Sequence, residues 1–293
     1  MVTAHSEYGQ LLSVYIKSPE TAFRSQQSLD NQWQEHRFLT APDFSKAVNE
    51  HSDFRRMLEL SGTQIKTFPA DETVSIDSLY CRDASIHTDF GVILCAMGKP
   101  LRRNEPAACE RQYVASGERI LGAIEAPGTV EGGDLAWLDH RTLAVGHGYR
   151  TNAEGIRQLR AFLEPYGITI IEVDLPHYHG PSDVFHLMSI LSPVDRNLAV
   201  VYSPLMSVRF RNHLMDRGFR LVEVPDQEFD SLGCNVLAVA PRKCLVEKNN
   251  QVTIARLREA GCEVTPFDGT HMCVPGGGGP TCLTRPVLRS IPD

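Results

Sequence analysis

A unit of helix, glycine and strand recurs five times along this chain of 293 residues. In each copy a helical stretch ends at a glycine, and an apolar run typical of a β-strand follows directly or within a few residues. A glycine just past a helix can adopt the left-handed conformation without a Cβ penalty, so each glycine predicts a helix C-terminus. The five boundaries are Gly62 before residues 63–68, Gly117 before 120–124, Gly167 before 168–173, Gly218 before 219–224 and Gly261 before 262–267.

Upstream of each glycine the pattern predicts two short strands, joined by a polar turn, and then an amphipathic helix. The third copy shows this order in residues 135–138, residues 142–146 and a helix that carries Ile156 and Leu159 at helical spacing. A unit of this size cannot bury its own apolar face, so the copies are expected to pack around a common centre. We therefore predict one α/β domain over residues 1–293, a five-fold pseudosymmetric α/β propeller of ββαβ modules.

Charge and hydropathy exclude several classes of partner. The net charge is −7 without any run of Lys and Arg, which argues against nucleic acid or an anionic membrane. No apolar run reaches the roughly 20 residues of a membrane-spanning helix, and the polar start over residues 1–10 does not resemble a signal peptide. We expect a cytoplasmic protein with a small-molecule substrate, and the sequence leaves a homodimer open.

The chain has eight cysteines, and none forms a Cys-x-x-Cys pair. Cysteines in apolar strands usually pack as small hydrophobic side chains. Those within or beside such strands are Cys95, Cys234, Cys244 and Cys262. A zinc site from His177, His179, His271 and Cys273 is an alternative, but its spacing fits no familiar ligand set, so we expect no metal.

Cys282 stands apart, because four glycines and a proline, residues 276–280, hold it in a loop. Backbone amides in such a loop can approach a ligand closely. The alternative is a glycine-rich connector with an incidental cysteine. A nucleophilic thiol also needs a base or proton shuttle and a carboxylate that orients it.

Other loops supply these groups at corresponding points of their modules. The second module opens with a loop that contains Asp77 and Asp83, the third with Glu131-Gly-Gly-Asp134 and the fourth with His186. Equivalent loops of a ring converge on one axis. We therefore expect residues 83, 131, 186 and 282 to meet.

These residues resemble a known family, the guanidine-modifying superfamily or penteins, which includes arginine deiminases, dimethylarginine dimethylaminohydrolases and amidinotransferases. The resemblance covers nearly the whole chain. Its motifs, in order, are Asp83 in Arg-Asp, Arg102-Arg103-x-Glu105, Glu131-Gly132-Gly133-Asp134, Arg150-Thr151-Asn152, His186-Leu187 and Gly278-Gly279-Pro280-Thr281-Cys282.

The resemblance implies a role for each candidate residue and implies no cofactor. Cys282 is expected to be the nucleophile, His186 the general acid and base, and Glu131 the acid that contacts this histidine. The substrate-binding residues implied are Asp83 for the guanidinium, Arg103 and Arg150 for the α-carboxylate, and Asp77 at a position that contacts substrate in the family. Taken without the family, both arginines could be solvated surface residues, and Asp77 and Asp134 could serve only in turns.

The chemistry of the guanidinium group supports the same choice of residues. Its carbon is a poor electrophile because the charge is delocalised over three nitrogens, so a strong soft nucleophile and a protonated leaving amine are both needed. A cysteine with a histidine meets this need. The bound cation should lower the pKa of Cys282, while Asp83 pairs with the guanidinium.

The substrate is where the sequence departs from its relatives. Arginine deiminases carry His-x-Asp in the fourth module, whereas this chain has Met188, which cannot accept a hydrogen bond from an unsubstituted guanidinium. Arg82 before Asp83 is nevertheless the deiminase form, so the pattern is mixed. We predict hydrolysis of N-methylated arginine to citrulline and a methylamine through an S-alkylthiouronium intermediate on Cys282.

Three alternatives stay open at this point. The first is a deiminase-type reaction on arginine or another guanidine, and the second is a non-catalytic binding module on the same fold. An amidinotransferase is the third and is disfavoured, because those enzymes are commonly longer. The polar stretch of residues 23–41 is long enough to cover the site.

Overall fold

The computed structural model describes residues 1–291, and all five predicted helix–strand boundaries are present in it. Each boundary glycine has a positive φ, between 74° and 88°. Such values lie in the left-handed region that side chains with a Cβ rarely adopt. The glycines therefore end the helices for the reason predicted. They are Gly62, Gly117, Gly167, Gly218 and Gly261.

Four modules share one order of elements: an antiparallel strand pair, a helix, and a third strand that runs parallel to the second. The second module comprises β4 (Ser85–Thr88), β5 (Gly91–Leu94), α4 (Glu105–Ala115) and β6 (Ile120–Ala123). The third comprises β7 (Leu135–Asp139), β8 (Thr142–His147), α5 (Ala153–Leu163) and β9 (Thr169–Asp174). The fourth comprises β10 (Leu191–Asp195), β11 (Leu198–Val201), α6 (Val208–Asp216) and β12 (Arg220–Glu223). The fifth comprises β13 (Leu237–Ala240), β14 (Lys243–Glu247), α8 (Gln251–Glu259) and β15 (Glu263–Phe267), with α7 (Asp226–Phe229) before it.

The first module takes one of its strands from the C-terminal end of the chain. β16 (Thr284–Ser290) pairs antiparallel with β2 (Gln10–Ile16), which pairs parallel with β3 (Gln64–Thr67) after α3 (Phe44–Leu60). The prediction that both strands of every module precede its helix is therefore wrong for this copy. Pairing the two ends of the chain covers edges that β2 and β16 would otherwise expose. The remaining short elements are β1 (Val2–Thr3), α1 (Pro19–Ala22) and α2 (Gln26–Gln32).

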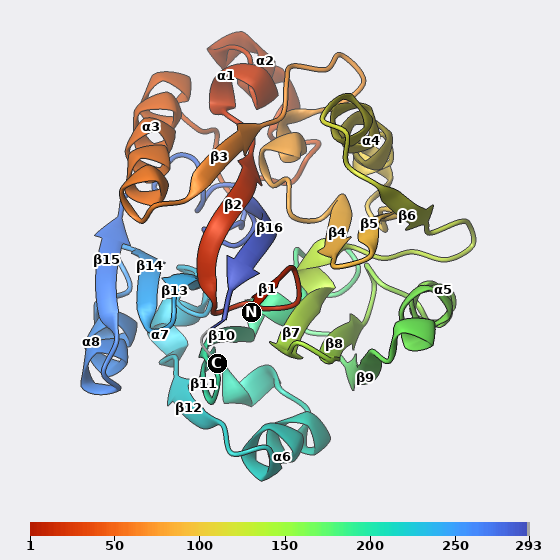
Figure 1. The fold of residues 1–293 in the computed structure, drawn as a ribbon. Coiled ribbons are helices and arrows are strands. Elements are labelled where there is room, and N and C mark those ends of the chain that lie inside the picture. The colour runs from red at the N-terminus through yellow and green to blue at the C-terminus, as the bar shows by residue number, and fades with distance from the viewer. Residues whose placement is uncertain (292–293) are drawn as a thin grey trace.

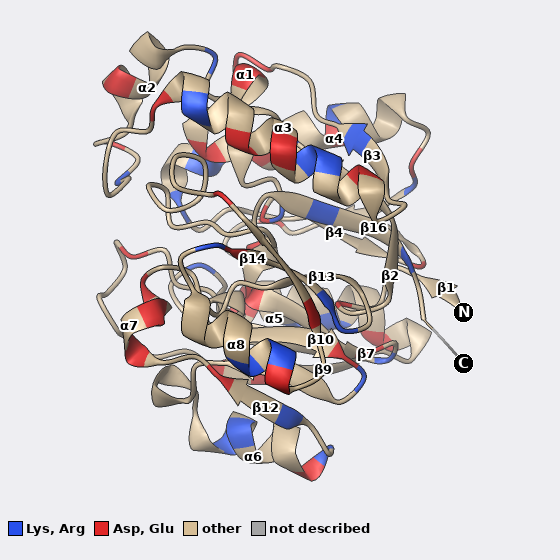
Figure 2. Cartoon of the chain, turned by 90° about the vertical axis from the view of Figure 1, so that its left-hand side faces the viewer, with Lys and Arg blue, Asp and Glu red and all other residues tan. Residues whose placement is uncertain are grey.

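The fold is α/β, with five small sheets that contact one another in succession. β16 packs against β4, an isolated bridge joins Ala96 to Val130, and β7, β10, β13 and β2 follow as neighbours. Figure 1 shows the sheets around the middle of the molecule and α3, α4, α5, α6 and α8 outside them. The outer helices carry charges of both signs, as along α3 and α8 (Figure 2).

Apolar side chains are buried between neighbouring modules as well as within them. One core cluster, for example, joins Ile93 of the second module to Val145 and Leu159 of the third. This shared burial is the reason that modules of this size are stable together. No helix within residues 1–291 is long and apolar enough to cross a membrane.

The loops that matter for function all precede the first strand of a module. Asp83, Asn235 and Cys282 each stand two residues before β4, β13 and β16, and Glu131 and His186 stand four and five residues before β7 and β10. The repeat therefore delivers one loop from each module to one end of the ring.

A close backbone contact fixes α5 beside the loop of the third module. The side chain of Asn152 caps α5 by accepting from Gly155 N at 2.8 Å, and it also accepts from Thr129 N at 3.0 Å. A Cβ on Gly155 would lie 2.1 Å from the carbonyl oxygen of Thr129. Glycine is thus required here by packing, although it lies inside a helix.

We predict that Gly155→Ala destabilises the protein, by about 1–3 kcal/mol, because the new methyl group overpacks this contact. Intrinsic helix propensity alone predicts the opposite sign, a gain of about 1 kcal/mol. Urea unfolding measures the difference, with the exposed Arg157→Ala in the same helix as the control. An increase in unfolding free energy for Gly155→Ala would contradict this packing.

Candidate active site

The five loops surround a cavity of about 360 Å³. Each loop contributes at least one lining residue, among them Asp83, Gly133, His186, Asn235 and Cys282. The structure thus brings the predicted residues 83, 186 and 282 to one cavity, with Glu131 directly behind His186. Residues 37 and 39 also line the cavity, so the predicted covering stretch of residues 23–41 does reach the site.

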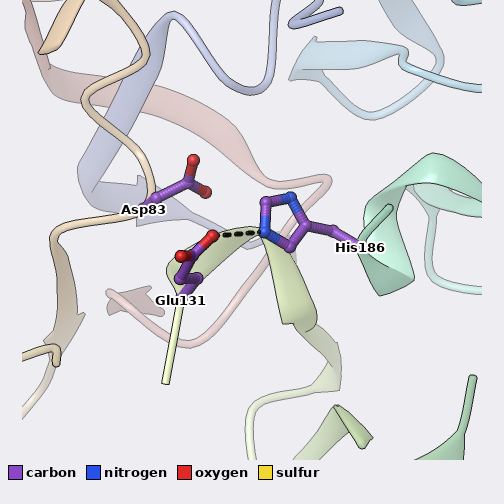
Figure 3. Close-up of side chains that lie close together, drawn as sticks. All are labelled: Asp83, Glu131 and His186. Carbon is purple, nitrogen blue, oxygen red and sulfur yellow. Dashed lines mark hydrogen bonds and ion pairs between the residues drawn. The ribbon is translucent and has the colours of Figure 1, made fainter. Parts of the chain in front are cut away.

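A short ion pair links the third and fourth modules at this cavity. His186 Nε2 lies 2.7 Å from Glu131 Oε2, and the imidazole is directed at the carboxylate with Asp83 beside it (Figure 3). Glu131 is fully buried, and Arg150 Nη1 donates to the same oxygen at 2.9 Å. The backbone N–H of Lys99 donates to the other oxygen at 3.0 Å.

This environment sets the charge of both partners. Burial alone would raise the pKa of Glu131, but the hydrogen bond from His186 and the charge of Arg150 hold it well below its usual range. Burial would lower the pKa of His186, but the carboxylates of Asp83, Asp134 and Glu131 outweigh it and raise the pKa. The surroundings of the pair therefore favour a carboxylate on Glu131 and the protonated form of His186.

The Gly-Gly step of the third module is explained by how closely these groups approach the backbone. A Cβ on Gly133 would lie 2.6 Å from His186 Nδ1 and 2.8 Å from Asp83 Oδ1. A Cβ on Gly132 would lie 2.2 Å from the carbonyl oxygen of Arg82. Both glycines belong to the 3₁₀ turn η3 (Gly132–Asp134). A side chain on Gly133 would displace His186 and Asp83, and one on Gly132 would displace the backbone next to Asp83.

Asp83 faces the cavity with both oxygens engaged by the protein. Oδ1 accepts from Gly133 N at 2.9 Å, and Oδ2 pairs with Arg102 Nη1 at 2.6 Å. Arg102 is buried and is also held by Glu105, through Nε at 2.9 Å and Nη2 at 2.8 Å. Each Asp83 oxygen retains a further lone pair, so the carboxylate can still accept from a ligand.

The predicted role of Arg103 is not supported by its position. Arg103 is exposed, and its Nε donates to the carbonyl oxygen of Pro100 at 3.2 Å. The tight turn η2 (Pro100–Arg102) presents only one of the two adjacent arginines to the interior, and Asp83 and Glu105 bind that one. Arg102, which lines the cavity, is therefore the arginine of this motif that a ligand can meet.

Asp77 lines the cavity as predicted, and the side chains of Lys99 and His36 hold it. Its Oδ2 lies 2.6 Å from Lys99 Nζ and 2.7 Å from His36 Nδ1. Burial would raise the pKa of Asp77, but the hydrogen bond from His36 and the charges of Arg102 and Lys99 lower it. Neither Lys99 nor His36 belongs to the motifs that the sequence offered.

Cys282 has a partner that sequence reasoning missed. Asn235 Nδ2 lies 3.3 Å from the sulfur, while Asn235 Oδ1 accepts from Thr281 N at 3.0 Å and from Thr281 Oγ1 at 2.8 Å. The repeat itself could have identified Asn235, because it stands two residues before its strand, as Asp83 and Cys282 do. The asparagine fixes the loop and supplies an N–H to the sulfur.

The thiol of Cys282 is neutral in the protein alone. Burial and the nearby carboxylate of Asp83 raise its pKa, against the hydrogen bonds from Asn235 and Thr281. An approaching cation would reverse the contribution of Asp83. A positively charged ligand beside Asp83 would therefore lower the pKa of this thiol.

The sequence singles out three further residues, and two of them, Arg150 and Met188, line the cavity. Arg150 is buried, lines the cavity, and donates from Nη2 to the carbonyl oxygen of Asp183 at 3.1 Å. Arg82 is turned away from the cavity and pairs with Glu7 at 2.8 Å, as expected for a residue that would repel a cationic substrate. Met188 lines the cavity. Apolar groups beside it include Tyr178, Val184, Phe185, Phe229 and Leu232.

Two clusters bear on the question of a metal. The ligand atoms of Asp83, Glu131 and His186 lie within 4.8 Å of one another, but the ion pairs described above already engage them. The four residues of the alternative zinc site do not form a cluster of ligand atoms within residues 1–291. His177 instead contacts the hydroxyl of Tyr149, and His271 accepts from the backbone N–H of Asp43. In the part of the chain that the structure describes, the ligand atoms of the Asp83–Glu131–His186 cluster are thus already paired with protein groups.

A family model described as "N,N dimethylarginine dimethylhydrolase, eukaryotic" matches residues 18–289. The chain belongs to this family. The N(G),N(G)-dimethylarginine dimethylaminohydrolase of Pseudomonas aeruginosa is 32% identical over 201 residues, which cover 67% of this chain and 72% of the relative. The protein of the same name from Streptomyces coelicolor is 33% identical over 230 residues, with 77% and 79% covered.

A solved structure agrees with this assignment at the level of the fold. The dimethylarginine dimethylaminohydrolase of Pseudomonas aeruginosa, as a cysteine-to-serine variant complexed with citrulline, matches with a TM-score of 0.76 at 24% identity. The match covers 94% of this chain and 99% of that one. The resemblance predicted from six ordered motifs is thus confirmed.

The raised pKa of Cys282 leads to a prediction for the protein without substrate. Alkylation of Cys282 by iodoacetamide should be slow at pH 7 and increase with a midpoint above about 8.5, the value of an unperturbed thiol. Mass spectrometry of the peptide that contains Cys282 measures the rate across pH, and Cys282→Ser reports the background from the other cysteines. A plateau already reached below pH 7 would show a resident thiolate instead.

Proposed function

We propose that this protein hydrolyses N-methylated arginine to citrulline and a methylamine, with Cys282 as the nucleophile. The observation that carries the proposal is one cavity lined by a thiol, an imidazolium and a carboxylate that can accept a guanidinium, Cys282, His186 and Asp83. Membership of the family confirms the prediction of a hydrolase that acts on C–N bonds of amidines. A non-catalytic binding module would not need a buried Glu131 that orients His186.

The residues suggest a balanced sequence of steps. The bound guanidinium lowers the pKa of Cys282, the thiol proton leaves to solvent, and the thiolate attacks the guanidinium carbon. His186 gives its proton to the methylated nitrogen, and the C–N bond breaks to release a neutral amine. An S-alkylthiouronium cation remains on Cys282.

The second half returns the groups to their first state. Neutral His186 takes a proton from a water molecule, and the resulting hydroxide attacks the same carbon to give a neutral tetrahedral adduct. The C–S bond then breaks while the hydroxyl of the adduct gives its proton to solvent, which yields citrulline and the thiolate. The thiolate takes up a proton from solvent once the cavity holds no cation. Glu131 stays ionised throughout and stabilises the imidazolium, with Arg150 and the Lys99 amide fixing its position. Its depressed pKa suits this role.

Substrate binding is assigned to the groups that line the cavity. We place the guanidinium on the free lone pairs of Asp83, and the α-carboxylate among the cations of the cavity, with Arg150 as its primary partner and Arg102 in place of Arg103. Asp77 already pairs with Lys99 and contacts His36, so its contribution is to position these two side chains. No cofactor is needed for any step.

Methylated arginine is preferred over arginine because of Met188. Its side chain lies in the cavity two residues after His186, where arginine deiminases carry an acid. An apolar wall suits N-methyl groups and leaves unsubstituted N–H groups without a partner. Arg82, the feature that pointed towards a deiminase, is paired with Glu7 outside the cavity and does not bear on the choice.

We also propose that the five modules form a closed five-fold propeller and act as a single catalytic domain. The support is the contact of each sheet with the next and the pairing of β16 with β2. The cavity draws on all five modules, so no smaller part of the chain would contain the whole site.

The direct test is turnover. The purified protein is incubated separately with asymmetric dimethylarginine, monomethylarginine and arginine, and the ureido product is measured. We expect turnover of the methylated compounds and its loss in Cys282→Ser. Turnover of arginine alone would contradict the assigned substrate, and equal activity of the serine variant would contradict the nucleophile.

Met188→Asp should shift the preference towards arginine, because the new carboxylate can accept from unsubstituted N–H groups. We expect the ratio of kcat/KM for arginine to that for dimethylarginine to rise by about 10-fold or more. Met188→Leu keeps an apolar wall and serves as the matched control. A ratio unchanged in Met188→Asp would show that this wall does not select the substrate.

Substitution of the two adjacent arginines, Arg102 and Arg103, tests which of them takes part in substrate binding. Arg102→Gln should lower kcat/KM by about 30-fold or more, because it leaves Asp83 and Glu105 buried without their cation. Arg103→Gln should stay within about 2-fold of the parent protein, as is usual for an exposed position. The reverse order of the two effects would restore the original prediction. Circular dichroism verifies that both variants are folded.

A further inference from the structure

A second cluster of charges lies behind the catalytic loop and is used by no step above. It consists of Arg82, before β4, and of Arg285 and Arg289, both on β16, which runs near the middle of the ring of sheets (Figure 1). Their exposed fractions are 1%, 5% and 1%. The N–H of Arg82 donates to the carbonyl oxygen of Cys282 at 3.2 Å, so the cluster adjoins the nucleophile loop.

The cluster has more positive than negative charge. Within the described residues, Glu7 is the one carboxylate that forms an ion pair with it, through Arg82 Nη2 at 2.8 Å. The other two arginines donate to carbonyl oxygens, Arg285 to those of Arg82 and Ser85 and Arg289 to those of Gly9 and Ala238. Three guanidinium groups against one carboxylate leave a net charge of +2.

These three cations act on one another. Burial, opposed by Glu7 but reinforced by the neighbouring arginines, lowers the pKa of Arg285 and Arg289 to about 10. Even so, each side chain keeps its proton at neutral pH. A buried charge without a counter-charge is strongly destabilising, so a structure of this kind requires a compensating group.

Unused hydrogen-bond donors show what kind of group is missing. Five buried nitrogens of the cluster have no partner within residues 1–291. They are Arg82 Nε and Nη1, Arg285 Nε, and Arg289 Nε and Nη2. All five are donors, and an arginine side chain has no acceptor. Water would accept from them but would bring its own hydrogens and no charge.

We infer that Arg82, Arg285 and Arg289 form a buried binding site for a small inorganic anion such as chloride. An anion accepts hydrogen bonds without donating any, and it reduces the excess charge of the cluster. The site is distinct from the catalytic cavity, because these arginines lie outside its lining. Bound there, the anion is part of the folded structure and not a substrate.

Bromide replaces chloride and can be located by its anomalous scattering. Crystals of the intact protein grown or soaked with sodium bromide should show an anomalous peak in contact with at least two of the three guanidinium groups. Bromide found at surface positions only, or the cluster filled by water at saturating bromide, would overturn the proposal.

Thermal unfolding tests the same site in solution. At equal ionic strength, chloride should raise Tm over gluconate in a saturable way, by about 2 °C or more, since a ligand that binds only the folded state stabilises it. Arg289→Met should abolish the difference between the two salts, while the exposed Arg157→Met should keep it. A chloride effect that is absent in the parent protein, or undiminished in Arg289→Met, would contradict the site. If Arg289→Met does not fold, the bromide measurement on the parent protein decides.

Discussion

The site depends on one buried carboxylate, that of Glu131. It has no exposure to solvent and receives hydrogen bonds from His186, Arg150 and the backbone of Lys99. These partners come from three different modules, so the same contacts that orient the imidazole also hold the modules in register. A buried carboxylate is destabilising unless its oxygens accept hydrogen bonds, and both oxygens of Glu131 do so.

The charges of the cavity are complete only when a cation is bound. Without one, burial and the carboxylate of Asp83 raise the pKa of Cys282, and the neighbouring carboxylates favour the protonated form of His186. A guanidinium placed on Asp83 supplies the positive charge that favours the thiolate. In the proposed mechanism, specificity for a cationic substrate and activation of the nucleophile thus come from the same interaction.

Local chemistry explains which parts of this could be predicted from the sequence. The boundary glycines, the Gly-Gly step and the order of Asp83, Glu131, His186 and Cys282 depend on backbone needs and side-chain types that are visible in the chain. The C-terminal origin of β16 depends on pairing across more than 260 residues, for which the sequence has no local signal. Arg102 and Arg103 differ only in which side of one tight turn they occupy, and Lys99 and His36 meet Asp77 through tertiary contacts alone. The family comparison supports the general assignment but says nothing about these individual contacts.

The covalent intermediate on Cys282 is the central claim, and rapid-quench mass spectrometry of the intact protein tests it most directly. Mixing the protein with asymmetric dimethylarginine and quenching in acid within the first turnover should reveal an adduct with the mass of the substrate less dimethylamine. Digestion should place it on Cys282, and the adduct should decay as citrulline forms. Citrulline formation without any detectable adduct would contradict the account. So would an adduct on a residue other than Cys282.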